Sequence, residues 1–270
     1  MLVKPNLVAP ANAQLACTHP RVARAVCAFL LDHRAEVLVG DSPAFGSAAQ
    51  VARICGLAAA LKPLGLKITS LGRPQAVRLS GGGRIGVSRL ALSAELILNL
   101  PRLKAHSQLR VTGAVKNLFG CVVGFRKALA HMRLGPTEGR FESMLVDVLG
   151  SLPRTVSLMD AIYPMHQTGP IYGRPFHLGL LAASSNPVAL DTAVYGILGL
   201  SPAAVPLWLE CLGRRLPGSR PEELLYPLEQ PKSFDAAGFM LPERLKPMEF
   251  RPLRFVRGRL ASLRDLLRRR

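Results

Sequence analysis

Residues 99–131 read NLPRLKAHSQLRVTGAVKNLFGCVVGFRKALAH, a stretch that combines many basic residues with many apolar ones. No acidic residue lies between Glu95 and Glu138, whereas this interval holds seven basic residues: Arg102, Lys104, Arg110, Lys116, Arg126, Lys127 and Arg133. Like charges repel one another, so folding alone gives little reason to group them without counter-ions. Because apolar residues interleave with the charges, we expect the stretch to be folded. It therefore predicts a structured surface that binds something negatively charged.

The whole chain is basic and rich in apolar residues. Its 270 residues include 35 Lys and Arg against 17 Asp and Glu, which gives a net charge of +18 and a pI near 10.8. The 49% hydrophobic content is enough for the core of one large or two small domains. The charge favours anionic partners and leaves three classes open: nucleic acid, an acidic membrane face, and phosphorylated or carboxylated metabolites. Outside the central stretch, a high arginine content without function is the competing interpretation.

The five cysteines are scattered, and no two of them have the C-x-x-C spacing. The sequence therefore contains no cluster-binding or zinc-ribbon cysteine motif. Free cysteines of this kind are typical of a reducing cytoplasm. No apolar run approaches the roughly 18 residues of a membrane span, and the N-terminus lacks a signal-peptide pattern. We expect a soluble cytoplasmic protein and leave peripheral membrane contact open.

Strand and helix patterns alternate along the first 200 residues. Strands are predicted at 36–39, 66–71, 77–79, 96–98, 156–159 and 178–182, and helices at 20–32, 47–61, 108–118, 141–149 and 187–198, the first with Thr18 as a possible cap. Such alternation predicts an α/β fold with a mostly parallel or mixed central sheet flanked by helices. Because ligands collect beyond the carboxyl ends of such strands, we expect the loops at 40–42, 99–106 and 160–173 to line one cleft.

The chain changes character after about residue 200. We predict an α/β domain over residues 1–200 and a Pro-rich, basic C-terminal extension over 201–270 that packs on it. Residues 244–270 contain ten basic and two acidic residues, and residues 258–270 have the pattern of an amphipathic, Arg-rich helix. Such a helix could lie on nucleic acid or an acidic membrane surface, and a solvated helix docked on the domain is the alternative.

The central stretch also supplies the candidate catalytic residues Lys104, His106 and Lys116. Lysine and histidine can hold a phosphate or carboxylate while moving a proton near neutral pH. Lys116 is the most telling, because an ammonium on an apolar helix face is costly to bury without a partner. The alternative is that Lys116 and its neighbour Asn117 only hydrogen-bond to nearby loops.

Further candidates lie on both sides of these residues. Arg126, Lys127 and His131 form a second basic group that could bind carboxylate or phosphate, although a solvated helix face explains it nearly as well. Asp41 follows a predicted strand and could act as a base, or bind a divalent metal together with Asp160. The backbone at Ser42 could contact an anion, but the loop lacks the lysine of a P-loop.

Several sequence blocks together resemble the domain of unknown function 362 family. The central blocks are N-L-P-x-L-K-x-H (99–106), T-G-A-V-K-N-L-F-G (112–120) and R-K-x-x-x-H (126–131), joined by K-P-N (4–6), T-H-P (18–20), G-D-S-P (40–43) and T-G-P-x-x-G (168–173). The resemblance adds ligand-binding candidates within these blocks: Lys4, Asn6, His19, Asn99, Asn117, Gly169 and Gly173. Members often carry ferredoxin-type iron–sulfur modules, which implies a redox setting and a ferredoxin-type electron donor. They also usually have a segment before K-P-N, so we expect the N-terminus to be incomplete.

The resemblance and the residues lead to two hypotheses. The first is an enzyme or enzyme-like protein that binds an anionic small molecule in a basic cleft lined by Lys and His, with an external electron donor if the reaction is redox. Its cofactor is not identified by the sequence, and a divalent metal is one option. The second is a nucleic-acid or acidic-membrane surface binder driven by the +18 charge.

Overall fold

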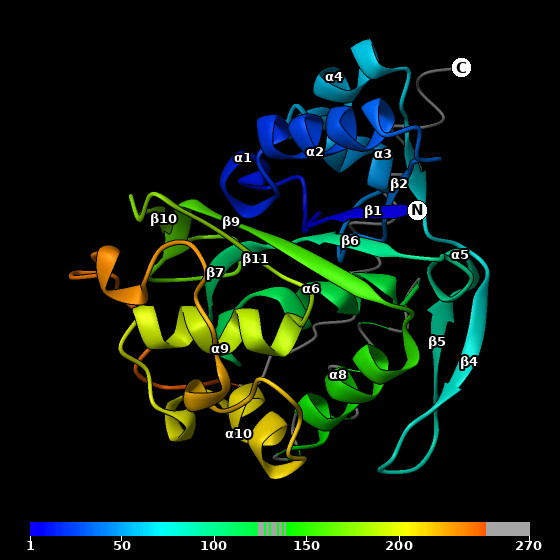
Figure 1. The fold of residues 1–270 in the computed structure, drawn as a ribbon. Coiled ribbons are helices and arrows are strands. Elements are labelled where there is room, and N and C mark those ends of the chain that lie inside the picture. Colours follow the sequence, from blue (N-terminus) through cyan, green and yellow to red (C-terminus); the bar gives the residue numbers. More distant parts are fainter. Residues whose placement is uncertain (124–126, 128–129, 131–133, 135–136, 138, 247–270) are drawn as a thin grey trace.

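The computed structural model describes residues 1–123, 127, 130, 134, 137 and 139–246. A central sheet lies between two layers of helices (Figure 1). Its strands follow the order β3-β2-β1-β6-β9-β7-β8, with β10 and β11 also paired to β9. The strand bounds are β1 Leu2–Pro5, β2 Leu38–Asp41, β3 Ile68–Ser70, β6 Ile97–Leu100, β7 Arg102–His106, β8 Arg110–Thr112, β9 Thr155–His166, β10 Arg174–Pro175 and β11 Leu180–Ser184.

Most of the strand pairs in this sheet are parallel. The pairs β1–β2, β2–β3, β1–β6, β6–β9 and β7–β9 are parallel, whereas β8, β10 and β11 run antiparallel to their partners. The predicted α/β fold with a mostly parallel, mixed sheet is therefore confirmed.

One helical layer covers each face of the sheet (Figure 1). The first layer contains α1 (Ala13–Ala16), α2 (Pro20–Asp32), α3 (Ala48–Ile54) and α4 (Leu57–Leu61). The second contains α6 (Ala114–Leu118), α8 (Arg140–Ser151), α9 (Pro187–Ile197) and α10 (Pro206–Gly213). Successive strand residues point to opposite faces. Accordingly, Val3 packs in the apolar cluster of the first layer, whereas Leu2 packs in a cluster that includes Phe141 of α8.

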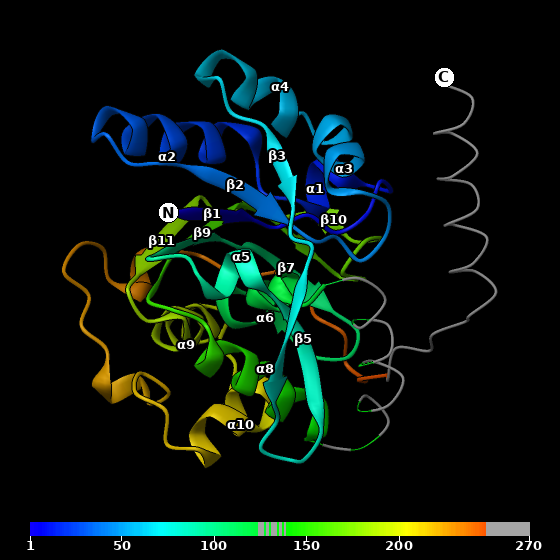
Figure 2. The ribbon, with the colours of Figure 1, turned by 90° about the vertical axis from the view of Figure 1, so that its right-hand side faces the viewer.

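A small hairpin stands beside the main sheet (Figure 2). It consists of β4 (Pro74–Arg78) and β5 (Arg84–Ser88), joined through a turn that contains the glycines at 81–83, and α5 (Arg89–Leu92) follows it. Short 3-10 helices complete the described elements: η1 Lys62–Leu64, η2 Phe119–Cys121, η3 Pro202–Ala204, η4 Pro221–Glu223 and η5 Pro231–Ser233. None of the described helices is long and apolar enough to cross a bilayer.

Three local predictions were wrong. The cap of α2 is His19, which accepts a hydrogen bond from the Arg21 N–H, and not Thr18. The helix predicted at 47–61 is broken at Gly56, where φ is 83°. The helix predicted at 108–118 is replaced by strand β8 and the short helix α6, because residues 110–112 pair with β7.

The described part of the C-terminal extension contacts the main unit at several places. The Gln167 N–H donates to the Met240 carbonyl at 2.8 Å, and the Lys246 N–H donates to the Ser107 carbonyl at 2.9 Å. The Arg110 guanidinium donates to the Pro242 carbonyl at 2.7 Å. The predicted Arg-rich helix at 258–270 lies outside the described residues.

Candidate functional site

The site begins with buried polar side chains at the carboxyl ends of β1 and β6. Lys4 and Asn99 are register partners on these parallel strands, and Asn99 also pairs with Ser157 of β9. The Asn99 amide donates to the Ser157 hydroxyl at 2.9 Å and to the Ala114 carbonyl at 3.1 Å. Asn117 of α6 donates in turn to the Asn99 side-chain oxygen at 2.8 Å. These bonds fix α6 against the sheet.

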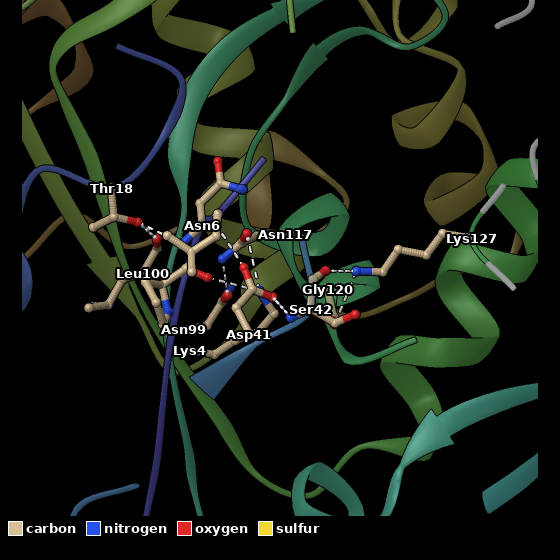
Figure 3. A network of polar contacts seen from close by, with 12 residues as sticks. Lys4, Asn6, Thr18, Asp41, Ser42, Asn99, Leu100, Asn117, Gly120 and Lys127 are labelled. Carbon is tan, nitrogen blue, oxygen red and sulfur yellow. Dashed lines mark hydrogen bonds and ion pairs between the residues drawn. The ribbon is translucent and has the colours of Figure 1, made fainter. Parts of the chain in front are cut away.

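Lys4 and Asp41 form a buried ion pair on neighbouring strands (Figure 3). Lys4 Nζ lies 3.0 Å from Asp41 Oδ1, and the two side chains are 0% and 1% exposed. Asp41 also accepts from the Leu7 N–H at 2.7 Å and from the Ser42 N–H at 2.8 Å. Its carboxylate is thus fully engaged by one lysine and two backbone donors.

Gly120 packs directly against this ion pair. A Cβ at this position would lie 2.3 Å from both Lys4 Nζ and Asp41 Oδ1, closer than any non-bonded contact allows. Gly120, the last glycine of the T-G-A-V-K-N-L-F-G block, is therefore required because the backbone lies too close to the ion pair to leave room for a side chain.

Lys104 belongs to the same site, because the charge of Lys4 acts on its pKa. It lies within β7, and its ammonium donates to the Ala16 carbonyl at 2.8 Å and to the Asn6 side-chain oxygen. Burial is the main cause that lowers the pKa of Lys104 to about 7; the charges of Arg102 and Lys4 act in the same direction, and that of Asp41 opposes them. Near neutral pH this lysine can therefore exist in both protonation states.

Lys116 lies on α6 and is partly buried. Its ammonium lies 4.4 Å from the centre of the Phe119 ring and 5.7 Å from that of Phe141. Burial, together with the smaller effects of the Lys127, Lys104 and Lys4 charges, lowers the pKa of Lys116 to about 7. Within the described part of the chain, no carboxylate pairs with it.

Lys127 completes the group. Its ammonium donates to the carbonyls of Ser42 and Gly120, the second at 3.3 Å. Burial lowers its pKa to about 8, while the charge of Asp41 opposes this shift. Figure 3 shows Lys127 reaching the same loops that hold the Lys4–Asp41 pair.

Lys4, Lys104, Lys116 and Lys127 are called the lysine cluster below. Each of the last three has a pKa lowered in part by other members, so the four charges share one electrostatic environment. The carboxylate of Asp41 raises the pKa values of Lys104 and Lys127 and so partly opposes the effect of burial on these two lysines. An anion placed here would favour the charged lysines, because an opposite charge stabilises the protonated form.

The loop containing Gly169 and Gly173 lies close to Lys104. A Cβ on Gly169 would lie 1.7 Å from the Ala105 carbonyl oxygen, and one on Gly173 would lie 2.2 Å from the His166 carbonyl oxygen. Both positions therefore require glycine, because the loop packs against the backbone of β7 and β9 too closely to leave room for a Cβ.

Two of the three candidate histidines, His106 and His19, have local roles in the chain. His106 is buried in β7, and its Nδ1 accepts from the backbone N–H groups of Gln108 and Leu109 at 3.1 and 3.2 Å. It thereby closes the turn between β7 and β8. His19 is exposed and caps α2. Arg126 and His131 lie outside the described residues.

Asp160 does not join Asp41. It lies within β9, where its carboxylate accepts from the Arg102 guanidinium and from the His19 N–H, the latter at 2.9 Å. Each of the two aspartates thus has a separate cationic partner. In the described part of the chain, no group of three or more His, Cys, Asp and Glu side chains is arranged to hold a metal ion.

Two of the seven basic residues in the central stretch make contacts within the fold. Arg102 pairs with Asp160, and Arg110 donates to the carbonyls of Ala204 and Pro242, so both hold the fold together.

Sequence reasoning also missed the role of Asp191. Its carboxylate accepts from the N–H groups of Ala114 and Val115 at 2.6 and 3.0 Å, and so caps α6. Gly113 makes room for it, because a Cβ there would lie 2.2 Å from an Asp191 oxygen. Burial raises the pKa of Asp191 to about 7. Only the glycine before the A-V-K-N segment signalled this close contact in the sequence.

The chain belongs to the family described as Domain of unknown function (DUF362), whose model matches residues 1–196. A curated relative, a thylakoid-associated protein of Synechocystis sp., is 37% identical over 262 residues, covering 96% of this chain and 81% of the relative. The lactate racemase apoprotein of Thermoanaerobacterium thermosaccharolyticum has a similar fold, with 13% identity over 70% of this chain and a TM-score of 0.45. A Thermotoga maritima protein gives 13% identity over 68% of this chain and a TM-score of 0.43. This chain spans 47% and 50% of these two solved chains.

Proposed function

We propose that this protein binds an anionic small molecule through the lysine cluster and acts on it as an enzyme or enzyme-like protein. The observation that carries the proposal is the charge imbalance at the site. Lys104, Lys116 and Lys127 have lowered pKa values, and the carboxylate of Asp41 is already occupied by Lys4. Lysines that titrate near neutral pH are suited to transferring a proton to or from a bound substrate. If the reaction is redox, an external donor of the ferredoxin type would supply the electrons.

The proposal has a thermodynamic consequence. Binding an anion raises the pKa values of nearby lysines, because it stabilises their charged form. At pH 8, above the pKa of about 7 of Lys104 and Lys116, the protein should therefore take up protons when the anion binds. At pH 6 these lysines are already largely protonated, and the uptake should be small.

Isothermal titration calorimetry with sulfate and oxalate tests this consequence. Both probes keep their charge between pH 6 and pH 8, so proton uptake reports on the protein alone. We expect the apparent enthalpy to depend on the ionisation enthalpy of the buffer at pH 8 and much less at pH 6. Lys104→Met and Lys116→Met should weaken binding at least tenfold, whereas Lys67→Met, at an exposed lysine, should leave it unchanged. Equal affinity in all three variants would refute the proposal.

A second candidate function is binding to an acidic surface through the basic end of the chain. Two observations favour a membrane surface as the partner, rather than nucleic acid or a C-terminal segment that binds nothing. The relative is named as thylakoid-associated, and residues 244–270 hold ten basic and two acidic residues. Sedimentation with acidic and with neutral lipid vesicles tests it. Binding should fall steeply with salt and be lost on truncation after Lys246, yet be unaffected by Lys116→Met. Equal binding to neutral vesicles would contradict this function.

A further inference from the structure

A small cavity lies in the second helical layer, between α6, α9 and α10, which are drawn in Figure 1. Apolar side chains form part of its lining, among them Val115 of α6 and Trp208 of α10. Helix α9 contributes polar side chains to the same cavity, namely Asp191, Thr192 and Tyr195. The cavity therefore joins polar groups of one helix to the helix that carries Lys116.

Two hydroxyl groups in this lining have no hydrogen-bond partner among the described residues. Thr192 and Tyr195 are each 2% exposed, and neither the Thr192 Oγ1 nor the Tyr195 phenolic oxygen makes a hydrogen bond there. The two residues are three positions apart in α9, so their side chains lie on the same face of the helix. A buried hydroxyl without a partner is costly, because it loses its bonds to bulk water and gains none in return. Two such hydroxyls at one cavity therefore indicate a shared hydrogen-bonding partner.

The size and chemistry of the cavity select water as that partner. The cavity offers about 10 Å³ to the centre of a water molecule, which is about the space that one buried water needs. An organic ligand is too large for this space, and the apolar part of the lining would not stabilise an ion. Water both donates and accepts hydrogen bonds, as the two hydroxyls do.

We propose that one buried water molecule bridges the hydroxyls of Thr192 and Tyr195 in this cavity. Buried waters usually have two to four hydrogen-bond partners. The two hydroxyls supply two of them. The carboxylate of Asp191 lines the same cavity and retains acceptor sites for a third, because two N–H donors do not saturate its oxygens.

The bridging water also supports the candidate functional site. Asp191 accepts from the N–H groups of Ala114 and Val115, at the start of α6, and Lys116 follows directly. A water bound between the α9 hydroxyls and this carboxylate holds the carboxylate that fixes α6 in place. Thr192 and Tyr195 are thus positioning residues for Lys116. This positioning role rests on the proposed anion-binding function, whereas the water site itself does not.

Urea unfolding of variants that lack one hydroxyl tests the water site. Tyr195→Phe and Thr192→Val remove the hydroxyls with little change in shape. Each should lower the urea midpoint, because the water loses a partner, and the losses in the double variant should not add, because both hydroxyls act through the same water. Tyr172→Phe, at an exposed tyrosine, is the control and should leave the midpoint unchanged. A midpoint that rises or stays the same in Tyr195→Phe would overturn the proposal, and so would additive losses.

A crystal structure of the full-length protein that resolves ordered waters gives the direct readout. We expect one water within hydrogen-bond distance of both the Thr192 Oγ1 and the Tyr195 phenolic oxygen. In crystals of Tyr195→Phe this water should be lost or displaced. Density for the cavity without a water, or a direct bond between the two hydroxyls, would overturn the proposal even if a variant fails to fold.

Sulfate titration tests the positioning role. We expect Tyr195→Phe to weaken sulfate binding several-fold and Tyr172→Phe to leave it unchanged. Unchanged sulfate affinity in a Tyr195→Phe protein that has lost the water would overturn the positioning role only. Absence of sulfate binding to the wild-type protein would instead refute the anion-binding function, so the two failures are distinguishable.

Discussion

Replacing Lys116 by methionine should stabilise the protein in the absence of an anion while weakening anion binding. Lys116 is held in a partly buried position among other lysines, without a carboxylate partner among the described residues. Methionine has a similar length and keeps a favourable contact with the Phe119 ring. The substitution therefore removes the charge with little change in packing.

The expected gain follows from the pKa of Lys116, which falls from 10.5 to about 7 on folding. Each unit of this difference corresponds to about 1.4 kcal/mol, so the charged form costs the folded state up to about 5 kcal/mol. The loss of the cation–π contact offsets about 1 kcal/mol, and solvent screening at this partly exposed lysine reduces the difference further. We expect a net gain of about 2–3 kcal/mol in the free energy of unfolding at pH 7.

The pH dependence separates this charge effect from a gain in apolar packing. Between pH 7 and 10.5, the folded protein binds fewer protons at Lys116 than the unfolded chain does. The wild-type protein therefore becomes more stable as pH rises through this interval. The variant lacks this contribution, so its advantage should be largest near pH 7 and shrink towards pH 10.

Urea denaturation followed by circular dichroism at pH 7, 8, 9 and 10 measures these differences. Lys67→Met is the control, because it removes the charge of an exposed lysine and corrects for the change in net charge. A Lys116→Met protein that is less stable than the wild type at pH 7 would refute the reasoning. So would an advantage that stays constant from pH 7 to pH 10, because it would arise from packing alone.

Three further predictions concern the groups that hold the cluster in place. Gly120→Ala should destabilise the protein by about 1–3 kcal/mol in urea unfolding, because its Cβ would clash with the buried ion pair. Gly150→Ala in α8 is the control: no atom lies within 4 Å of its Cβ position, so it should stabilise the protein by up to about 1 kcal/mol. Similar stability changes in the two variants would contradict the clash. Asp41→Asn should cost about 3–5 kcal/mol in the same assay, because it leaves the ammonium of Lys4 buried without a counter-charge; a loss below 1 kcal/mol would show that the pair is dispensable. Asp191→Ala should cost about 1–2 kcal/mol through loss of the cap on α6. The pKa of Asp191 rises from 3.8 to about 7 on folding, so the wild type should become less stable as the pH is raised from 4 to 7, and the variant should not. Parallel profiles of stability against pH in the two proteins would argue against this titration.

The parts of the fold that could be predicted from sequence are those whose signals are local. Residues 20–32 and 187–197 carry helical periodicity and a proline in the first turn, and both are helices in the structure. β9 continues to His166, well beyond the predicted end at residue 159, because β7, β10 and β11 pair with it from distant parts of the chain. Residues 110–112 became a strand for the same reason. Non-local pairing of this kind leaves little trace in a short window of sequence.

The candidate site shows the same division. Lys4, Asp41 and Asn99 each stand at the end of a strand, and parallel pairing brings such ends to one edge of a sheet, so their proximity was predictable. The functions of Arg102 and Asp191 were not, because their partners lie 58 and 76 or more residues away.

The cost of the lysine cluster is itself an argument for a ligand. Buried ionic groups are often no more stabilising than apolar side chains of similar size, and an unpaired buried charge is destabilising. Lys104 and Lys127 make hydrogen bonds that uncharged polar side chains could also make, and Lys116 contacts only aromatic rings among the described residues. If these lysines served the fold alone, methionine or leucine would serve it better. Sites that lower stability in the free protein are typical of binding and catalytic groups, whose charges are balanced only when the ligand is present. An anion that enters this site would therefore restore the missing stability and be held by the same charges that make the free protein less stable.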